Sequence, residues 1–148
     1  MSIGPPAIIE ALEMRPHPEG GWYAETWRAA AHGGERPRGS AIVYLLAAGE
    51  WSHWHRVDAD EVWQYSAGDP LELRVWAVGD AAITVHRLGG DIEGGAAVQA
   101  VVAAGAWQAA RPLGEWTLVG CIVTPAFDYA GFELAAPGWV PPVDPVGS

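Results

Sequence analysis

Between residues 40 and 124 the chain repeats short stretches in which apolar and polar residues alternate, and glycine, proline or aspartate separates them. Alternation with a period of two predicts strands, because successive side chains of a strand point to opposite faces of a sheet. The pattern predicts strands over residues 22–27, 40–49, 52–57, 60–68, 71–79, 81–88, 97–112, 115–129 and 132–134. The two long segments, 97–112 and 115–129, together are expected to form one or two pairs of strands. Eight or more strands without intervening helices indicate an all-β sandwich or barrel.

The remaining segments follow other patterns. Ile8, Ile9 and Leu12 recur at helical spacing after two prolines, which predicts a short N-terminal helix over residues 6–14. The glycine-rich segment 29–40 predicts a loop of about ten residues that is mobile or covers a pocket. The tail, residues 136–148, contains four prolines and cannot enter a sheet, so we expect it to be disordered or to lie as a strap over a core formed by residues 8–135.

Composition and charge exclude several classes of function. With 148 residues, half of them apolar, the chain fits one domain over residues 1–148. A formal charge of −10 argues against nucleic acid as a partner, and the absence of lysine excludes Schiff-base chemistry. No apolar run approaches the roughly 18 residues of a membrane span, and the N-terminus lacks a signal-peptide pattern, so a soluble, cytoplasmic protein is expected. Cys121 lies alone in an apolar run and is expected to pack as a small hydrophobe.

Residues 49–73 contain the main candidate site. His53 and His55 are two apart, so both side chains point to one face if this segment is extended, and two imidazoles on one face can bind one metal ion. Carboxylates follow at positions 58, 60 and 61. We expect Glu61, Trp63 and Tyr65 to point inward on the next strand, which adds a third ligand and aromatic walls. The alternative is a surface loop in which histidines and aspartates share hydrogen bonds.

Several stretches resemble a known family. GEWSHWHRVDADEVWQYSAG resembles the first cupin motif, in which a His-x-His pair precedes a glutamate and a glycine, and VVAAGAWQAARP resembles the second. With HPEGGWYAETWR, SAIVYLLAAGE and DYAGFEL, their order resembles a family of small cupins of unknown function, over roughly residues 8–135. The resemblance implies a cupin β-jelly roll of the RmlC-like type, with two antiparallel sheets and a pocket between them at the open end.

The resemblance also implies a divalent metal such as Mn, Fe, Ni or Zn. The matching positions are His53, His55, Glu61 and Gln108. One additional residue separates His55 from Glu61, so a bulge must absorb it or the ligand set differs. Gln108 stands where the second motif has histidine, and an amide oxygen is the weaker ligand, which favours manganese or iron over zinc, or an empty site. Gln64 also stands where this family commonly has histidine.

A metal-free alternative uses the same pocket. Cupin-fold sugar-nucleotide epimerases use a histidine base held by an aspartate, opposite a tyrosine acid. Here His55 with Asp58 or Asp60 would face one of three tyrosines, a geometry suited to proton transfer at neutral pH. The candidate acids are Tyr44, Tyr65 and Tyr129. The expected catalytic set is His55, Glu61, Tyr65 and Glu25.

Arginine and aromatic residues are candidates for substrate binding. A guanidinium binds phosphate or carboxylate through two hydrogen bonds, and Arg28, Arg56 and Arg111 lie in or beside the motifs, although each could instead pair with one of the many acids. Glu25 is expected either to pair with Arg28 or to have a raised pKa. Most of the nine tryptophans are expected to fill the core or a subunit contact. The expected substrate-binding set is Arg28, Tyr44, Trp63 and Arg111.

Two functions remain open at this stage. The first is an enzyme that acts on a carbohydrate-like or carboxylated metabolite as an isomerase, an epimerase or a metal-assisted lyase. The second is a non-catalytic binding protein, similar to storage cupins, with a degenerate metal site, which Gln64 and Gln108 favour. In both cases a homodimer is expected, because the chain has an apolar surplus and small cupins commonly pair through an outer sheet.

Overall fold

Apart from the two-residue strand β1, which was not predicted, the strands occur where the alternating pattern predicts them. The computed structural model describes residues 3–143. It contains helix α1 (Pro5–Ala11) and the short 3-10 helix η1 (Tyr129–Gly131). The strands are β1 (Arg15–Pro16), β2 (Trp22–Arg28), β3 (Ser40–Ala47), β4 (Ser52–Val57), β5 (Asp60–Gly68), β6 (Leu71–Trp76), β7 (Thr84–Leu88), β8 (Gln99–Val102), β9 (Trp107–Pro112), β10 (Trp116–Thr124) and β11 (Phe132–Leu134). The predicted all-β fold with one N-terminal helix is confirmed, although the helix ends at residue 11 and not at 14.

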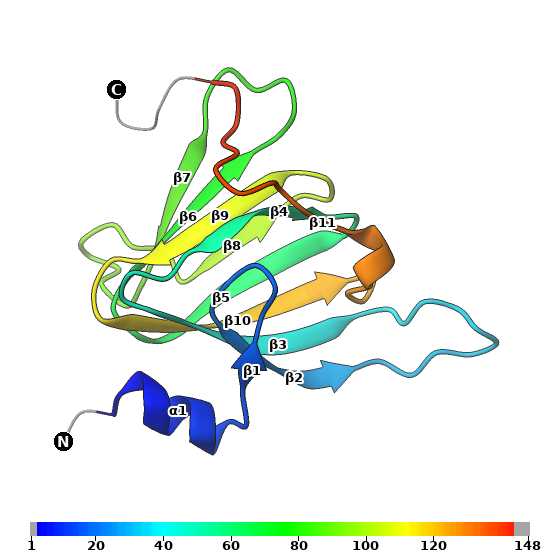
Figure 1. Cartoon of the computed structure of the whole chain (residues 1–148), viewed down its shortest axis with the longest axis horizontal. Coiled ribbons are helices and arrows are strands. Elements are labelled where there is room, and N and C mark those ends of the chain that lie inside the picture. Colours follow the sequence, from blue (N-terminus) through cyan, green and yellow to red (C-terminus); the bar gives the residue numbers. More distant parts are fainter. Residues whose placement is uncertain (1–2, 144–148) are drawn as a thin grey trace.

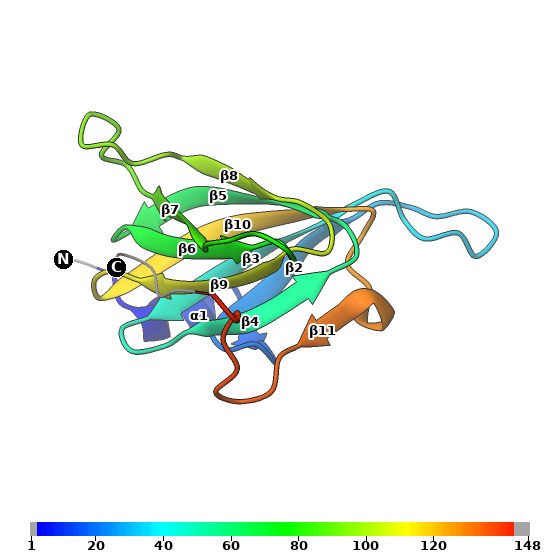
Figure 2. The same cartoon turned by 90° about the horizontal axis from the view of Figure 1, so that it is seen from above.

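The strands form two antiparallel sheets that face each other (Figures 1 and 2). The six-stranded sheet has the order β1-β2-β3-β10-β5-β8, and the five-stranded sheet has the order β11-β4-β9-β6-β7. Strands distant in sequence are neighbours in space: β10 lies between β3 and β5, and β9 lies between β4 and β6. This crossed order is that of a jelly roll.

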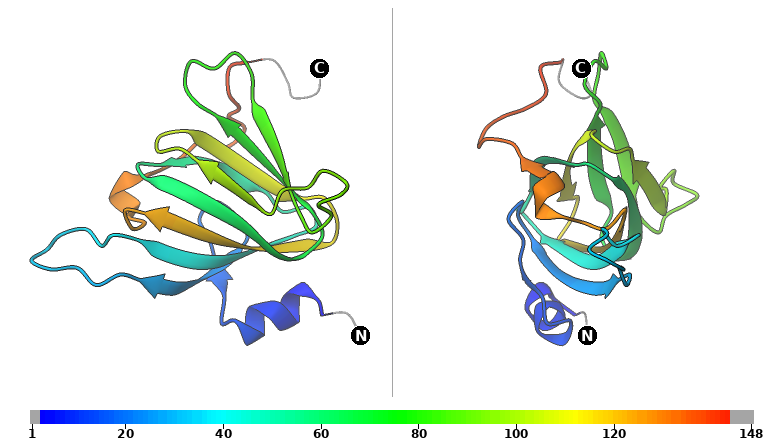
Figure 3. Two further views of the ribbon diagram at one scale, coloured as in Figure 1. Left: turned by 180° about the vertical axis from the view of Figure 1, so that it is seen from behind. Right: turned by 90° about the vertical axis from the view of Figure 1, so that its right-hand side faces the viewer.

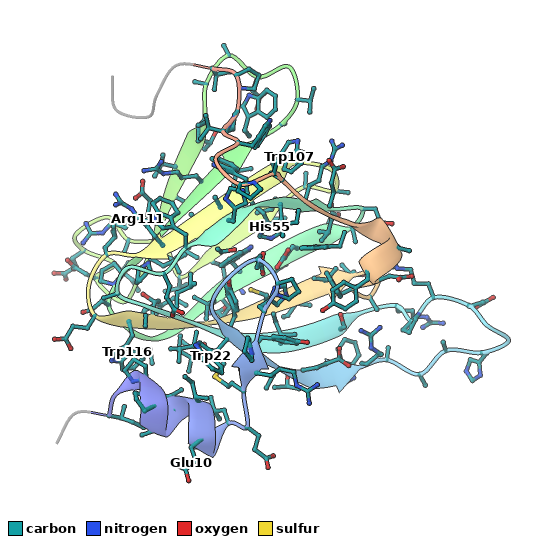
Figure 4. All side chains as sticks on the ribbon, in the orientation of Figure 1. Glu10, Trp22, His55, Trp107, Arg111 and Trp116 are labelled. Atoms are coloured by element: carbon teal, nitrogen blue, oxygen red, sulfur yellow. The ribbon has the colours of Figure 1, made fainter. Side chains whose placement is uncertain are left out.

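The core fills the space between the sheets. Leu46 on β3, Leu73 on β6 and Val119 on β10 are completely buried there. A second apolar layer covers the outer face of the six-stranded sheet, where Ile8 of α1 and Met14 pack on Leu45. Trp22 and Trp116 flank this contact beside α1, while Glu10 points away from the sheet (Figure 4).

One end of the sandwich is built from non-strand segments. The loop between β2 and β3 projects from this end, and η1 lies beside it (Figures 1 and 3). Residues 17–21, between β1 and β2, fold against the strands as a turn in which Gly20 and Gly21 have positive φ. These segments surround the opening between the sheets.

The C-terminal segment lies outside the sheets, as its prolines predict. Residues 136–143 cross the five-stranded sheet, where Trp139 packs on Trp54, Trp76 and Trp107. The last five residues of the predicted strap, 144–148, lie outside the described residues. Within the part of the chain that the structure describes, no helix is long and apolar enough to cross a membrane.

Candidate functional site

A cavity of about 500 Å³ opens between the sheets at the end formed by the β2–β3 loop and η1. Its size lies within the range of small-molecule sites. Titratable side chains and aromatic rings both line it. The lining residues are His17, Glu19, Tyr23, Glu25, Arg28, Gly34, Glu35, Arg36, Pro37, Ser40, Ile42, His55, Val57, Glu61, Cys121, Val123, Phe127, Asp128, Tyr129 and Phe132.

Glu19 is the centre of the hydrogen-bond network in this cavity. Its Oε2 lies 2.6 Å from Nδ1 of His55 and accepts a hydrogen bond of 3.0 Å from the Ser52 hydroxyl. Its Oε1 lies 3.3 Å from Nδ1 of His17. The Glu19 backbone is also fixed to β4, because its carbonyl oxygen accepts a hydrogen bond from the His53 amide at 2.7 Å. Glu19 therefore connects the turn that carries His17 to strand β4, which carries His55.

The pair of Glu19 and His55 is a buried ion pair. Burial alone would lower the pKa of His55, but the charge and hydrogen bond of Glu19, with the charge of Glu61, raise this pKa to about 9. Burial alone would raise the pKa of Glu19, but His55, His17 and Ser52 lower it. At neutral pH His55 is therefore an imidazolium. Its Nδ1 contacts Glu19 and the His53 carbonyl, and no hydrogen bond among residues 3–143 uses Nε2, which leaves Nε2 to a ligand in the cavity.

His17 has the opposite protonation state. Its Nδ1 accepts a hydrogen bond from the Glu19 backbone amide at 3.2 Å, so the ring proton lies on Nε2. Burial lowers the pKa of His17, and the charge of His55 lowers it further, although Glu19 opposes both effects. The cavity thus contains one charged and one neutral imidazole at pH 7.

Glu61 is held by an amide on the opposite sheet. Nε2 of Gln108 donates to Oε1 of Glu61 at 2.9 Å, and Oε1 of Gln108 accepts from the Trp63 indole at 2.7 Å. Burial raises the pKa of Glu61, and the charge of Glu19 raises it further, while His55, Gln108 and Cys121 lower it, which gives a pKa of about 7. A carboxyl with this pKa can both release and accept a proton at neutral pH.

These shifts predict that the protein loses stability as pH rises from about 5 to about 9. Glu61 and His55 both bind protons more tightly in the folded state than in the unfolded state, whose values are 4.5 and 6.5. The stabilisation from Glu61 is complete below pH 4.5 and lost as pH rises through 7, and that from His55 is complete below 6.5 and lost through 9. Each contributes on the order of 3 kcal/mol.

Urea unfolding at pH 5, 7 and 9 measures this slope. The variant Glu61→Gln should flatten the slope between pH 5 and 7 and leave the loss between pH 7 and 9. A free energy of unfolding that is constant or rises with pH over this range would contradict the assignment of both pKa shifts.

Comparisons with known proteins agree with this fold. A family described as Cupin superfamily (DUF985) matches residues 6–135. The chain belongs to this family of cupins. It is 34% identical to a protein from Shewanella oneidensis, covering 91% of this chain and 86% of that one with a TM-score of 0.86. It is 32% identical to a hypothetical protein from Leishmania major, covering 90% and 88% with a TM-score of 0.82.

More distant cupins share the fold alone. The oxalate decarboxylase of Lactobacillus farciminis has 12% identity and a TM-score of 0.59, over 85% of this chain and 34% of that one. The capsular polysaccharide assembling protein CapF of Staphylococcus aureus has 17% identity and a TM-score of 0.63, over 82% and 31%. No curated protein matches this cupin.

The two histidines of the first motif do not share a face in this cupin. Ser52 pairs with Ala110 and His55 pairs with Gln108, so three steps along β4 span two steps along β9. This β-bulge shifts the alternation, with the result that Ser52 and His55 both reach Glu19. The His53 side chain lines a different cavity, and its Nε2 contacts the carbonyl oxygen of Ala136 at 3.0 Å. The expectation that His53 and His55 converge on one ion is therefore wrong.

Other predicted pocket residues lie outside the cavity as well. Trp63 is 1% exposed and belongs to the core, as does Tyr44, whose hydroxyl donates to the Gly20 carbonyl oxygen. Tyr65 is partly buried, and its hydroxyl donates to the carbonyl oxygen of Gly68 at 2.6 Å. Of the three tyrosines considered as the acid, only Tyr129 lines the cavity. Arg111 lies on β9 and binds Glu72 at 2.6 Å, away from the cavity (Figure 4).

The predicted charged residues at the cavity mouth pair among themselves. Glu25 and Arg28 both line the cavity, and Arg28 donates to the two Glu25 oxygens at 3.0 and 2.9 Å, which is one of the two arrangements expected for Glu25. Asp58 binds Arg36, and Asp60 accepts from the Ala104 amide, so neither aspartate holds His55. The carboxylate that holds His55 is Glu19.

Three residues that matter in this cavity were not predicted. Glu19 and His17 belong to the segment HPEGG, where a histidine and a glutamate two residues apart precede two glycines, and that spacing was the available signal. Arg36 connects the β2–β3 loop to the rest of the cavity wall through Asp58 and the Ala126 carbonyl oxygen. This loop lines the cavity with residues 34–37, as one of its two predicted roles requires.

The arrangement of donors does not fit a metal ion. Gln108 must present its amide oxygen to the Trp63 indole and its NH₂ group to Glu61, so the oxygen that would bind a metal is already used. His53 is directed to a different cavity and cannot join His55 at one ion. Among residues 3–143 no group of three or more His, Cys, Asp or Glu side chains is placed to hold a metal. Gln108 instead positions Glu61.

Proposed function

We propose that this cavity binds a small carbohydrate-like or carboxylated metabolite and catalyses proton transfer next to its carbonyl group, as an isomerase or epimerase. The observation that supports the proposal is the meeting of the Glu19–His55 ion pair and Glu61 in one cavity. Two groups with separated pKa values in one site are typical of an acid and a base.

The roles follow from the protonation states. Glu61, ionised above pH 7, takes the proton from the carbon next to the carbonyl group. The carbonyl oxygen accepts a hydrogen bond from Nε2–H of the His55 imidazolium, which stabilises the negative charge that develops on this oxygen. Glu61 completes an isomerisation by returning this proton to the neighbouring carbon, whereas an epimerisation requires a second group to donate a proton to the other face of the same carbon while Glu61 releases its proton to solvent. Tyr129, at the mouth, is a second candidate donor.

Solvent isotope exchange tests this proposal without knowledge of the product. The protein is incubated in D₂O with a panel of sugar nucleotides, sugar phosphates and 2-oxo acids, and loss of the C–H signal is followed by NMR. We expect exchange with one class of compound and a loss of about 100-fold or more in Glu61→Gln. Glu133→Gln, which breaks an exposed ion pair with Arg56 outside the cavity, is the matched control and should retain activity within a few-fold.

Non-catalytic binding remains the second candidate function. The observation that favours it is the hydrogen bond from Gln108 to Glu61, which occupies one carboxylate oxygen. Saturable binding of a panel compound without exchange, unchanged in Glu61→Gln, would support this candidate and contradict the first. The homodimer and the cytoplasmic location expected from the sequence stay predictions.

A further inference from the structure

A second cavity, of about 390 Å³, lies on the outer face of the five-stranded sheet. It is separate from the barrel cavity and shares no lining residue with it. Three tryptophans, a histidine and an arginine line most of it. The lining residues are Trp51, His53, Trp54, Arg74, Ala109, Gly138, Trp139 and Val140.

This outer face concentrates positive charge in an acidic protein. The chain has a formal charge of −10 and eight arginines. Arg111, Glu72 and Arg87 are aligned across β9, β6 and β7, so they point to the same face. Glu72 binds Nε of both Arg74 and Arg111 at 3.0 and 2.6 Å. Glu72 balances one of the guanidiniums of Arg74, Arg87 and Arg111, so this group of four residues has a net charge of +2.

Several polar groups at this cavity have no partner among residues 3–143, although Nε2 of His53 contacts the Ala136 carbonyl oxygen and Nε of Arg74 binds Glu72. Among the described residues, the hydrogen bonds of Arg74 involve only Nε, so its two terminal NH₂ groups are free. No hydrogen bond of residues 3–143 involves the indole N–H of Trp51, Trp54 or Trp139. Arg74 and Arg111 each lie 5.2 Å from the centre of the Trp51 ring, which orders both guanidiniums beside the cavity.

We propose that this cavity is a second binding site, for a planar aromatic ring that bears a carboxylate. Flat indole walls favour an aromatic ring, since aromatic pairs gain energy beyond the burial of their area. The terminal NH₂ groups of Arg74 match the two oxygens of a carboxylate, and the net positive charge of this face favours an anion. Ala109, with its small side chain, forms part of the floor of the cavity.

An NMR titration with three matched compounds tests this site. The compounds are 2-naphthoate, the neutral alcohol 2-naphthalenemethanol, and cyclohexanecarboxylate, which lacks the aromatic ring. We expect 2-naphthoate to shift the indole N–H signals of Trp51 and Trp139 saturably, with an affinity about tenfold or more above that of the other two compounds. Arg74→Gln should remove this advantage over the alcohol, and Ala109→Leu should block all three compounds.

Controls elsewhere on the surface separate specific from general effects. Trp27 is 51% exposed and Arg15 is exposed, both outside this cavity, so Trp27→Ala and Arg15→Gln should leave the affinity unchanged. Glu61→Gln should also leave it unchanged, because the barrel cavity is separate. Equal affinity for 2-naphthoate in the wild type and Arg74→Gln, or no saturable shift up to millimolar concentration, would overturn the proposal. Since Arg74 is partly exposed, its replacement tests the site even if Ala109→Leu disturbs packing.

Discussion

Replacement of Glu19 by glutamine is expected to lower the free energy of unfolding at pH 7 by about 3 kcal/mol. Glu19 is 7% exposed, and its charge is the main reason that buried His55 remains protonated. Glutamine has the same shape and can still accept from Ser52, but it cannot balance an imidazolium. The pKa of His55 should therefore fall, and with it the stabilisation that the raised pKa supplies. Urea unfolding measures the loss, and NMR titration of the His55 ring measures the pKa.

The pH dependence identifies the ion pair as the cause of this loss. Because wild-type His55 becomes neutral as pH rises through 9, the difference between the wild type and Glu19→Gln should shrink over that range. Glu25→Gln is the matched control, since Glu25 also pairs with a cation but is 41% exposed, and such pairs contribute about 1 kcal/mol or less. A loss in Glu19→Gln no larger than that in Glu25→Gln would contradict the buried ion pair.

The fold could be predicted because alternation is a local signal. Residues 52–57, 60–68 and 132–134 form strands with the predicted bounds, since each stretch alternates and a turn bounds it. The inward positions of Glu61 and Trp63 on β5 also follow from this alternation and are confirmed, since these residues are 7% and 1% exposed. In a regular strand, the sequence pattern therefore determines which side chains point inward and which point outward.

The site could be predicted only in part, because its geometry depends on interruptions of that pattern. The bulge in β4 moves His55 to the inner face and leaves His53 outside, although both lie in one strand. A single additional residue on one strand of a pair has no distinct signature in the alternation of β4. Glu19 comes from a turn, and its contact with His55 across 36 positions is set by how residues 17–21 fold against β4. Both the bulge in β4 and the position of the 17–21 turn depend on contacts between residues that are distant in sequence.

Gln108 illustrates how a residue can be located correctly but interpreted wrongly. The family resemblance implies that Gln108 and Glu61 belong to one ligand set, and the structure does bring the two together. Its amide, however, is oriented by the Trp63 indole, a partner that the motif does not include. Since an indole can only donate, the amide oxygen must face Trp63 and the NH₂ group must face Glu61. The identity of one neighbour therefore changes a candidate metal ligand into a residue that positions a carboxyl group.

Replacement of Gly20 by alanine is expected to cost about 3 kcal/mol or more of stability and to disorder the Glu19 network. Gly20 has φ of 112°, and a Cβ atom there would lie 2.0 Å from the backbone oxygen of Trp51. Backbone cannot yield as a flexible side chain can, so the turn 17–21 must move away from β4. Glu19 would then lose its position beside His55. Urea unfolding measures the stability, and the His55 ring signal reports on the ion pair.

Gly105→Ala separates the two causes of this loss. Gly105 also has a positive φ, of 84°, but a Cβ atom there would meet nothing within 4 Å. Its replacement should therefore cost only the conformational strain, about 1 kcal/mol, and should leave the pKa of His55 near 9. If Gly20→Ala lost no more stability than Gly105→Ala and kept the His55 titration, close packing of the turn against β4 would not be what places Glu19. The position of this carboxylate would then have to come from its hydrogen bonds to Ser52 and His55 alone.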